Sequence, residues 1–305
     1  MESFGGHEKE HIVVIQPYAS KFSQELKYQF DHNDKISLLI NRYINRRVLN
    51  AIKRYRTQID SIGYLVDDDL QAMIYDPSIP IRHKIRPAQT EFFLGRNASL
   101  FDQFYASTPP LAKLLAEKYS LKQAPLVLPP IEKLPPASTK PIDANRLYYF
   151  AKMHSHEHKF LFPIVQKVLE KAPKASFDVI AVGQWAKKWK SIDRVTVHPE
   201  MDVTSYRGFI EQLPVGGIFL LPLMNTQLNA SRSDTKLFEV VISGSTVIAA
   251  NHPAYINAPT TKLTANQDIW VSEILNKMQS SDLIHEHQTL RQYLINRAHT
   301  QRVAI

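Results

Sequence analysis

The regular alternation of strand and helix segments in the second half of the chain is the feature that most constrains its fold. Short, apolar, partly β-branched runs typical of buried strands occupy residues 146–151, 177–183, 194–199, 218–223 and 246–250. Between them lie helical segments at 160–171 and 204–213, a short basic-aromatic loop at 185–190, and a helix that ends at Gly244. This alternation predicts a parallel, doubly wound sheet of the Rossmann type. No G-x-G-x-x-G fingerprint occurs, so the usual dinucleotide-binding loop is not expected.

The first half of the chain indicates a second, smaller α/β domain. Strands are expected at 11–16, 61–66, 101–105 and 124–130, and helices at 21–30, 35–56 and 106–119. Proline then recurs five times between Pro129 and Pro141, which is typical of a stiff linker. We therefore predict a short N-terminal domain at 1–140, a C-terminal domain at 141–285 and a terminal helical segment at 286–305.

Composition narrows the classes of function. The 305 residues carry a net charge of +8, which favours anionic partners without naming one, and contain no cysteine for disulfides or thiolate metal sites. No apolar run is long enough to span a bilayer, and the polar N-terminus does not resemble a signal peptide, so a cytoplasmic location is expected. Nucleic-acid binding stays open on charge, but no helix-turn-helix, zinc-finger or RNP pattern occurs, and nucleic acid is not expected as a partner.

The segment 35–56 has an apolar helical stripe and seven Lys and Arg residues. A basic amphipathic helix can lie on an anionic membrane, which would make the protein peripheral to the inner membrane. The alternative is a solvated basic face over a core.

Residues 229–255 contain the strongest candidate site. Ser233 is the expected N-cap of the helix that ends at Gly244, with Asp234 in its first turn. Arg232, Lys236 and Glu239 then share one helix face, where the two cations could hold phosphate oxygens and the carboxylate a ribose diol. The alternative is a solvent-exposed pair between Lys236 and Glu239.

Two further polar groups follow predicted strands. Asp67, Asp68 and Asp69 come directly after the strand at 61–66, where ligands gather in open α/β sheets, although an N-cap or a charged loop would also explain them. His154, His156 and His158 alternate in a segment expected to be a loop after the strand at 146–151. A zinc site there is a weaker alternative, because the ligand spacing is untypical.

Residues 231–250 resemble the donor-site segment of GT-B glycosyltransferases, above all the retaining family-4-like group, whose pattern is roughly S-x-x-K-x-x-E-x-x-x-x-G-x-P-V-I-A. The resemblance implies that Lys236, with Arg232, meets the donor diphosphate and that Glu239 holds the nucleotide ribose. Ser233, Asp234 and Thr235 would line the same site. Two positions depart from the pattern: Ser231 stands where many members have a second glutamate near the donor sugar, and Thr246 replaces a proline.

Other segments extend this resemblance over most of residues 60–255. Residues 153–159 resemble a G-T-x-x-H-x-x-D-F loop, which places His156 on the family histidine and Lys159 on its acid, near the donor phosphates. His198 matches a segment beside the nucleotide base, and Asn229 could meet sugar hydroxyls. Residues 67–70 resemble a D-x-D-D-L element, which implies a role for Asp68 toward the acceptor as a general base or orienting group.

The resemblance implies an α/β protein of two Rossmann-like domains that face each other across a cleft, with the helix in 286–305 crossing back to the N-terminal domain. The expected activity is transfer of a sugar, with retention, from a nucleotide-sugar donor to a bacterial surface glycan or glycolipid of the lipopolysaccharide or capsule type, without a metal or other cofactor. Two alternatives stay open. One is a CMP-linked sugar acid donor, and the other is a non-catalytic subunit that binds a nucleotide or a glycan.

Overall fold

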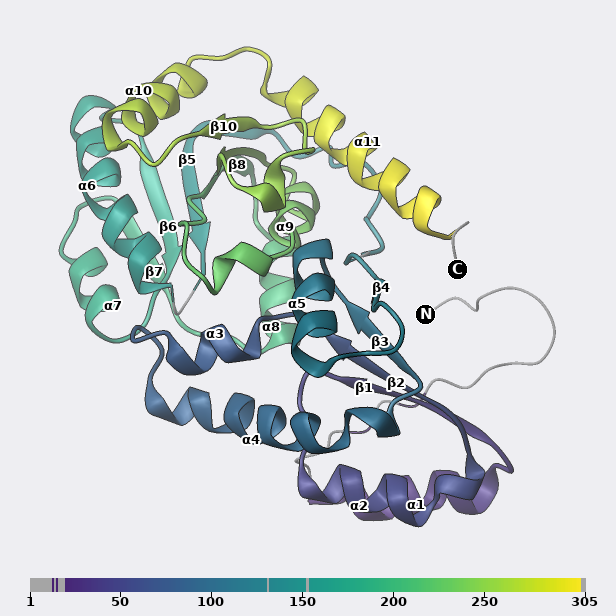
Figure 1. Ribbon diagram of the computed structural model, residues 1–305. Helices are drawn as coiled ribbons and strands as arrows, with labels where there is room; N and C mark the ends of the chain where they lie inside the picture. The colour runs from purple at the N-terminus through teal and green to yellow at the C-terminus, as the bar shows by residue number, and fades with distance from the viewer. Residues whose placement is uncertain (1–12, 14, 16–19, 131, 152–153, 303–305) are drawn as a thin grey trace. The chain divides into compact units, whose positions relative to one another are not determined.

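The computed structural model describes residues 13, 15, 20–130, 132–151 and 154–302 of the chain (Figure 1). The chain divides into two compact units, one formed by residues 1–74 and 81–127 and the other by residues 75–80 and 128–305. Each unit contains one sheet in which all paired strands are parallel. Among the described residues, no helix has both the length and the apolar character needed to cross a bilayer.

The N-terminal unit is built on a four-stranded sheet in the order β1-β2-β3-β4. Its strands are β1 (Ile36–Asn41), β2 (Ile59–Val66), β3 (Gln103–Ala106) and β4 (Leu126–Val127). Its helices are α1 (Phe22–His32), α2 (Arg46–Arg54), α3 (Leu70–Tyr75), α4 (Ile81–Asn97) and α5 (Pro109–Tyr119). Phe22 and Phe30 of α1, Ile62 and Tyr64 of β2 and Leu111 of α5 share one buried apolar cluster.

The single helix predicted over 35–56 is wrong. Residues Ile36–Asn41 form β1, in which half-buried residues alternate with exposed ones, and α2 begins only at Arg46 after the N-cap Asn45. The period of two in Ile36, Leu38 and Ile40 is a strand period, and pairing with the buried strand β2 favours it over the helical pattern. The strand predicted over 11–16 lies mostly outside the described residues.

The C-terminal unit contains a six-stranded sheet in the order β10-β9-β8-β5-β6-β7. Its strands are β5 (Ile142–Phe150), β6 (Ser176–Ile180), β7 (Val195–His198), β8 (Gly216–Leu221), β9 (Thr246–Ala250) and β10 (Thr261–Leu263). Its helices are α6 (Ser155–Lys171), α7 (Gly183–Lys190), α8 (Val203–Glu211), α9 (Lys236–Ile242), α10 (Gln267–Met278) and α11 (Leu283–Arg302). Counted from β5, this is the 3-2-1-4-5-6 order of a Rossmann fold.

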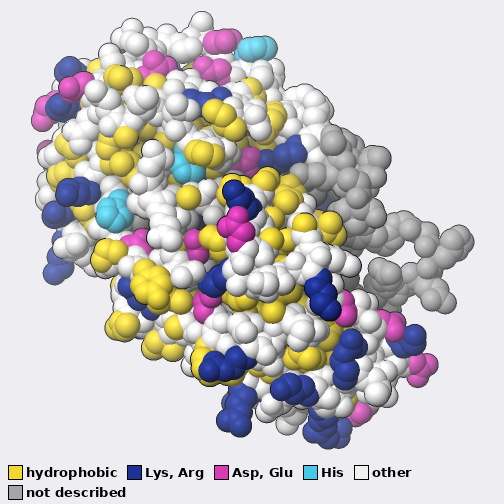
Figure 2. Space-filling model, in the orientation of Figure 1, with side chains coloured by type: hydrophobic (Ala, Val, Ile, Leu, Met, Phe, Trp, Pro, Cys, Tyr) yellow, Lys and Arg dark blue, Asp and Glu magenta, His cyan; other side chains and the backbone are white. Residues whose placement is uncertain are grey.

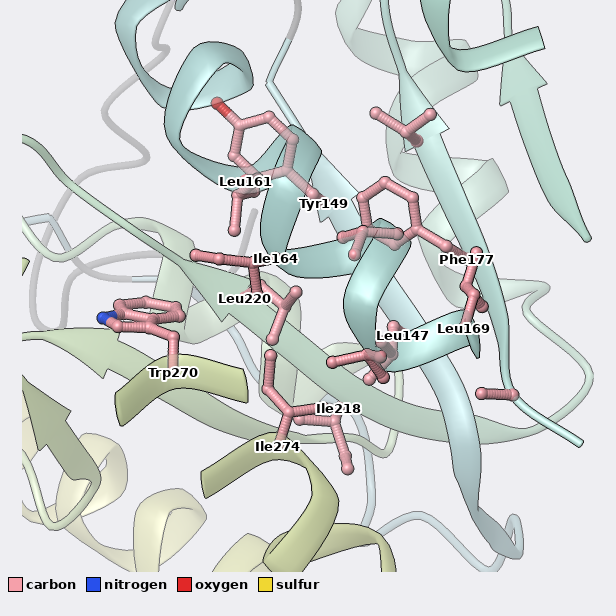
Figure 3. Close-up of a cluster of buried hydrophobic side chains, with 14 of the residues drawn as sticks. Leu147, Tyr149, Leu161, Ile164, Leu169, Phe177, Ile218, Leu220, Trp270 and Ile274 are labelled. Carbon is pink, nitrogen blue, oxygen red and sulfur yellow. The ribbon is translucent and has the colours of Figure 1, made fainter. Parts of the chain in front are cut away.

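Helices bury both faces of this sheet. Successive side chains of a strand point to opposite sides, so each strand contributes to both buried clusters. Leu147 and Tyr149 of β5 join Phe177, Ile218 and the inner faces of α6 and α10, as Figure 3 shows. Tyr148 and Phe150 join the opposite cluster, which α8, α9 and α11 cover. The sequence pattern of continuous apolar strands therefore reflects a sheet covered by helices on both faces.

Two local predictions in this unit need correction. Residues 185–190, expected as a loop, belong to α7, whose Trp189 is fully buried under the sheet. The helix expected from residue 160 begins at Ser155, so His156 and His158 lie at its start and not in a loop, and His154 directly precedes it. A helix turns by about 100° per residue, which separates side chains that would share one side of a strand.

The C-terminal end of α9 follows the prediction closely. Gly244 has φ +75° and lies directly after the C-cap Ser243. The N–H of Gly244 donates to the carbonyl of Val241 (3.1 Å) and that of Ser245 to Val240 (3.0 Å), which together form a Schellman motif. This turn leads the chain from α9 into β9, which spans Thr246–Ala250 as expected.

Candidate functional site

The order of the C-terminal sheet fixes where a ligand is expected. Strands β5 and β8 are neighbours, and the chain continues to opposite edges of the sheet from them. Ligands of open α/β sheets bind outside the carboxyl ends of the strands at such a switch point. The segments that follow β5 and β8 lead into the first turn of α6 and into residues 222–235 before α9.

A cluster of Lys236, Glu239 and Tyr206 lies beside the carboxyl end of β5. Lys236 Nζ donates to the backbone oxygen of Phe150 (2.7 Å) and to both carboxylate oxygens of Glu239 (2.9 and 2.8 Å). Tyr206 of α8 donates its hydroxyl to Glu239 Oε2 and lies 3.3 Å from Lys236 Nζ. Contributions from β5, α8 and α9 thus meet at one point, and we call these three side chains the Lys236 cluster.

The electrostatics of the Lys236 cluster keep the tyrosine protonated. Burial first, and then the negative charge and hydrogen bond of Glu239, raise the pKa of Tyr206 far above its usual value. The hydroxyl is therefore a permanent donor at neutral pH. The side chains of Lys236 and Glu239 keep 33% and 17% of their surface exposed, so a ligand can reach the ion pair from solvent.

A second acid, Glu157, is buried at the switch point itself. Its Oε2 accepts the hydroxyl of Tyr149 (2.7 Å), and its Oε1 accepts the side-chain amide of Asn229 (3.3 Å). His154 Nδ1 lies 3.3 Å from Oε2. Asn229 also donates to the backbone oxygen of Met224 (2.8 Å), so the segments after β5 and β8 are tied together through the Glu157 carboxylate.

Burial alone would raise the pKa of Glu157, but His154, the Tyr149 hydroxyl and the positive charge of Arg232 together lower it below its usual value. Glu157 is therefore an ionised carboxylate in a nearly water-free position, with 4% of its surface exposed. Arg232 lies directly after the 3-10 turn Asn229–Ser231 and contributes its charge to this acid.

His156 and Lys159, predicted to approach the donor phosphates, are exposed on α6, while the buried residues of that turn are Glu157 and His158. His158 Nδ1 accepts the indole N–H of Trp189 (3.1 Å), and its ring stacks on Trp185. Among the described residues, no group of His, Asp and Glu side chains is arranged to hold a metal ion.

The predicted N-cap is wrong. Helix α9 begins at Lys236 after Thr235, and no side-chain oxygen caps it. Ser233 instead shares a hydrogen bond with Thr235 (2.7 Å between the hydroxyl oxygens), and buried Asp234 forms an ion pair with Arg297 of α11. Burial raises the pKa of Asp234, and Arg297 offsets part of that rise. Asp234 therefore anchors the start of α9 to α11.

His198 ends β7 and lies near the Lys236 cluster. Its Nε2 is 2.8 Å from Asp178 Oδ1, and its ring packs edge-on against Phe150, whose carbonyl binds Lys236. The ring also tilts against Phe209 of α8. Phe150 is buried, with 3% of its surface exposed, so these ring contacts hold the His198 ring against the core.

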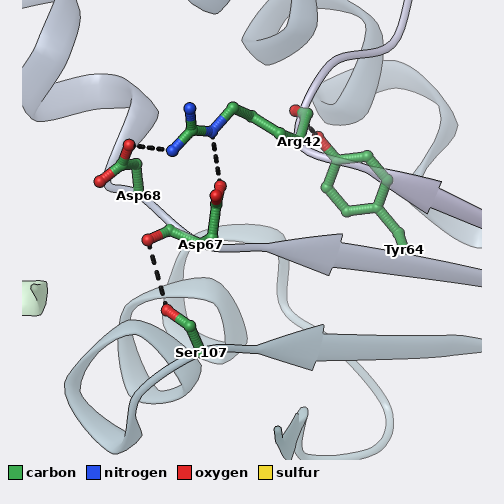
Figure 4. A network of polar contacts seen from close by, with 5 residues as sticks. All are labelled: Arg42, Tyr64, Asp67, Asp68 and Ser107. Carbon is green, nitrogen blue, oxygen red and sulfur yellow. Dashed lines mark hydrogen bonds and ion pairs between the residues drawn. The ribbon is translucent and has the colours of Figure 1, made fainter. Parts of the chain in front are cut away.

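In the N-terminal unit, Asp68 belongs to a clamp at the carboxyl end of β2 (Figure 4). Arg42 Nε donates to Asp67 Oδ1 (2.5 Å), and its NH2 group pairs with buried Asp68. Asp69 instead accepts the N–H of Ala72 (2.9 Å) in the first turn of α3, as a capping residue does. Burial raises the pKa of Asp67, and the Arg42 charge partly reverses that rise.

Arg42 itself adopts φ +62°, which is uncommon for a residue with a Cβ, and its carbonyl accepts the hydroxyl of Tyr64 (2.6 Å). Strained backbone of this kind often occurs at functional positions.

No protein-family model matches the chain, and no curated protein matches its sequence. Solved structures do match its fold. TarM of S. aureus matches over 89% of this chain and 54% of its own, with a TM-score of 0.63 and 11% identity. The chain has the GT-B fold.

Two other GT-B structures agree. The pneumococcal O-GlcNAc transferase GtfA, in complex with UDP and GlcNAc, matches over 93% of this chain and 59% of its own, with a TM-score of 0.56 and 12% identity. The UDP-forming α,α-trehalose-phosphate synthase from Burkholderia vietnamiensis matches over 90% and 73%, with a TM-score of 0.57 and 10% identity. The chain spans little more than half the length of TarM and GtfA.

Within this GT-B chain, Lys236 and Glu239 pair with each other and contact Tyr206, while Asn229 and Arg232 both interact with Glu157. The sequence contains one signal for Glu157, an acid at the third position of a helix, where acids favour the first turn. Tyr206 lies inside an ordinary amphipathic helix, and no sequence pattern marks it.

Proposed function

We propose that the protein is a glycosyltransferase and that its C-terminal unit binds the nucleotide diphosphate part of a nucleotide-sugar donor. The observation that supports this most is the Lys236 cluster at the switch point of a Rossmann-type sheet, where a partly exposed cation, a carboxylate and a phenol converge. The structural neighbours named for UDP or for UDP-forming synthesis have the same fold.

In this proposal the ion pair between Lys236 and Glu239 opens when the donor binds. The ammonium group has three N–H donors, and it can keep the Phe150 carbonyl while it turns from the carboxylate to a phosphate oxygen. Glu239 then accepts hydrogen bonds from a ribose diol, with Tyr206 still holding its other oxygen. The pair is therefore a preformed site that exchanges one partner for a ligand.

Charge stabilisation would supply most of the catalysis. A departing nucleoside diphosphate gains negative charge on its terminal phosphate in the transition state, and Lys236 and Arg232 are the cations placed to offset that charge. The negative charge of Glu157 balances the positive charge of Arg232, and its carboxylate accepts a hydrogen bond from the Asn229 amide. Both contacts hold residues 229–232, the segment that we expect to face the donor sugar. We infer transfer of a hexose with retention, and that step includes no metal.

For the acceptor we propose a bacterial surface glycan or glycolipid, made on the cytoplasmic side of the membrane. In the N-terminal unit, the Arg42 clamp holds Asp67 and Asp68 at the carboxyl end of β2, which is the position expected for a group that orients an acceptor hydroxyl.

The test begins with binding. Thermal-shift titrations with UDP, GDP, ADP and CMP should give stabilisation by one nucleoside diphosphate, and Lys236→Ala or Glu239→Ala should weaken that affinity at least tenfold. Lys113→Ala is the matched control, because it breaks an exposed Lys–Glu pair in α5. Equal affinity in all four proteins would overturn the site.

Donor hydrolysis and transfer then separate the alternatives. Release of nucleotide from a nucleotide sugar, lost in Lys236→Ala, supports the enzyme. Stabilisation by CMP alone indicates a CMP-linked donor. Binding of a nucleotide with no turnover of any nucleotide sugar indicates a non-catalytic subunit and contradicts the transferase proposal.

A further inference from the structure

We propose that the outer face of α4 is a docking surface for an anionic lipid membrane. This α4 face consists of Ile81, Ile85 and Phe92, flanked by Arg82, Lys84 and Arg96. The inference is independent of the proposed chemistry, because it concerns the N-terminal unit and needs no nucleotide.

The apolar part of the α4 face is exposed to an unusual degree. Ile81, Ile85 and Phe92 expose 78%, 53% and 54% of their surface. Their spacing of four and seven residues places them along one side of the helix. A single exposed isoleucine needs no explanation, but a stripe of large apolar side chains along one helix marks an interaction surface.

The opposite side of α4 is fixed to the unit, so the stripe cannot rotate inward. Pro87, Thr90 and Leu94 are buried. The hydroxyl of Thr90 accepts the N–H of Ile44 (3.1 Å), and Glu91 is held by Lys118 and by the hydroxyl of Tyr119 (3.0 Å). The helix therefore has one face for the core and one for solvent.

The charges beside the stripe are positive. Arg82, Lys84 and Arg96 accompany it, and the helix contains one acid, Glu91, which Lys118 neutralises. The guanidinium of Arg96 lies 3.7 Å from the centre of the Phe92 ring, so an aromatic side chain and a cation occupy the same spot. Figure 2 shows hydrophobic and basic side chains next to each other over the part of the surface where Figure 1 places α4.

This combination fits a lipid surface better than the other occupants. The ends of aliphatic and aromatic side chains insert at the level of the acyl chains, while cations beside them meet anionic headgroups. A nucleic acid would use the cations but not the isoleucines. A second copy of the same face would bring cation against cation, which opposes association.

Helix α2, where the sequence pattern first suggested a membrane contact, lacks the apolar half of such a surface. Its Val48, Leu49 and Ile52 are buried in the core, and its exposed side chains include Arg47 and Lys53. Substitutions in α2 therefore test whether exposed cations alone, without exposed apolar side chains beside them, account for membrane binding.

The experiment is co-sedimentation of the full-length chain with vesicles of phosphatidylcholine alone or mixed with phosphatidylglycerol. We expect binding only to the mixed vesicles, reduced by salt. Ile85→Glu combined with Phe92→Glu should abolish binding. Replacing Arg82, Lys84 and Arg96 by Gln should weaken it by about two orders of magnitude, since each cation near an anionic surface contributes about fivefold.

Two matched controls keep the result specific. Ile284→Glu changes an isoleucine of α11 that is 60% exposed, and Arg47→Gln with Lys53→Gln removes two cations of α2. Both should retain nearly all binding, and all variants should keep the wild-type melting temperature within a few degrees.

Binding that survives Ile85→Glu with Phe92→Glu, or that is lost equally in Arg47→Gln with Lys53→Gln, overturns the proposal. The proposal is also overturned if analytical ultracentrifugation shows a dimer and the α4 substitutions dissociate it, since the α4 face would then be a contact between two copies of the chain. Nucleotide affinity measured on the same variants reports separately on the proposed function.

Discussion

At the scale of single residues, Glu157 shows how a buried carboxylate can stay ionised. An isolated carboxylate in a protein interior becomes neutral, because burial disfavours its charged form. Around Glu157, His154, the Tyr149 hydroxyl and the charge of Arg232 reverse that tendency and lower its pKa. Asn229 and Arg232 were expected near the donor, and both interact with this acid, whose one signal in the sequence is its place in the first turn of a helix.

Glu157→Gln is expected to destabilise the protein in a pH-dependent way. Folding lowers the pKa of Glu157 below its ordinary value of 4.5, so the ionised form stabilises the native state above that pH. The stabilisation is lost as the pH falls through the lower, folded pKa. Charged hydrogen bonds of this kind contribute about 1.5–3 kcal/mol.

Melting curves of the wild type and Glu157→Gln from pH 7 to pH 3 check this expectation. The gap between the two melting temperatures should be widest above pH 4.5 and should shrink below it. Taking differences cancels the other titrating groups, Asp67 and Asp234 among them. A gap that stays constant, or widens in acid, would show that the carboxylate is not held in its charged form.

Tyr206→Phe tests the other half of the site. The substitution removes the hydroxyl that holds Glu239 but keeps the ring that packs in the core cluster beside α9. We expect nucleotide affinity to fall by about tenfold, the equivalent of one lost hydrogen bond to a charged group, while the melting temperature changes little. Tyr293→Phe, in α11, is the control. An unchanged affinity in Tyr206→Phe would remove Tyr206 from the site.

At the scale of elements, Gly216 lets β8 approach the α9–β9 turn, and Gly244 lets that turn approach the segment before β5. A Cβ on Gly216 would lie 2.0 Å from the backbone oxygen of Gly244, and one on Gly244, whose φ is +75°, would lie 2.6 Å from Ser138 Oγ. Neither contact is possible without a shift of the surrounding atoms. The sequence pattern predicts Gly244 from its place after a helix, but the role of Gly216 depends on contacts far away in the chain.

Gly216→Ala should therefore destabilise the protein by about 1–3 kcal/mol, the range of an overpacked core position. Gly208→Ala is the matched control, because Gly208 lies within α8 and a Cβ added there would have open space around it. Alanine at this position should stabilise the helix by about 0.5–1 kcal/mol. Chemical denaturation of both variants gives the comparison, and equal stabilities would contradict the close approach.

The ion pair between Asp234 and Arg297 is a second test at this scale. Both side chains are largely buried, with 9% and 17% exposed, so removal of one partner leaves a charge without its counterion. Arg297→Met should cost about 3–5 kcal/mol. The double variant Arg297→Met with Asp234→Asn should recover part of that loss. If the stability losses of Arg297→Met and Asp234→Asn simply add in the double variant, the two residues do not act as a pair.

The sequence predicts elements with a clear period and a local stop signal, such as β9 and the end of α9. It fails where two periods overlap or where distant contacts decide. Ile36, Leu38 and Ile40 fit a strand, yet Ile36, Leu39, Ile40 and Tyr43 also fit a helix, and only pairing with β2 selects β1. The start of α9 shows the same limit, because Asp234 binds Arg297 rather than the helix N–H groups.

For the whole molecule, we predict which of the two units a bound nucleotide protects from hydrogen exchange. The Lys236 cluster and Glu157 both lie in the C-terminal unit. Hydrogen exchange of the full chain with and without the best-binding nucleotide should show new protection near residues 150, 157, 206 and 229–239. Strands β1 and β2 should exchange as before. Protection confined to the N-terminal unit would contradict the proposed donor site.

The contacts of α11 have a consequence for how this protein is made. Arg297 pairs with Asp234, 63 residues earlier in the chain, and Arg291 donates to the backbone oxygen of Pro135. During translation the six strands of the C-terminal sheet can therefore be complete while the entrance to α9 still has no anchor. Asp234 has this counterion only once residue 297 has been made and the chain released, so a premature stop shortly before Arg297 should yield a protein in which the entrance to α9 is not anchored to α11.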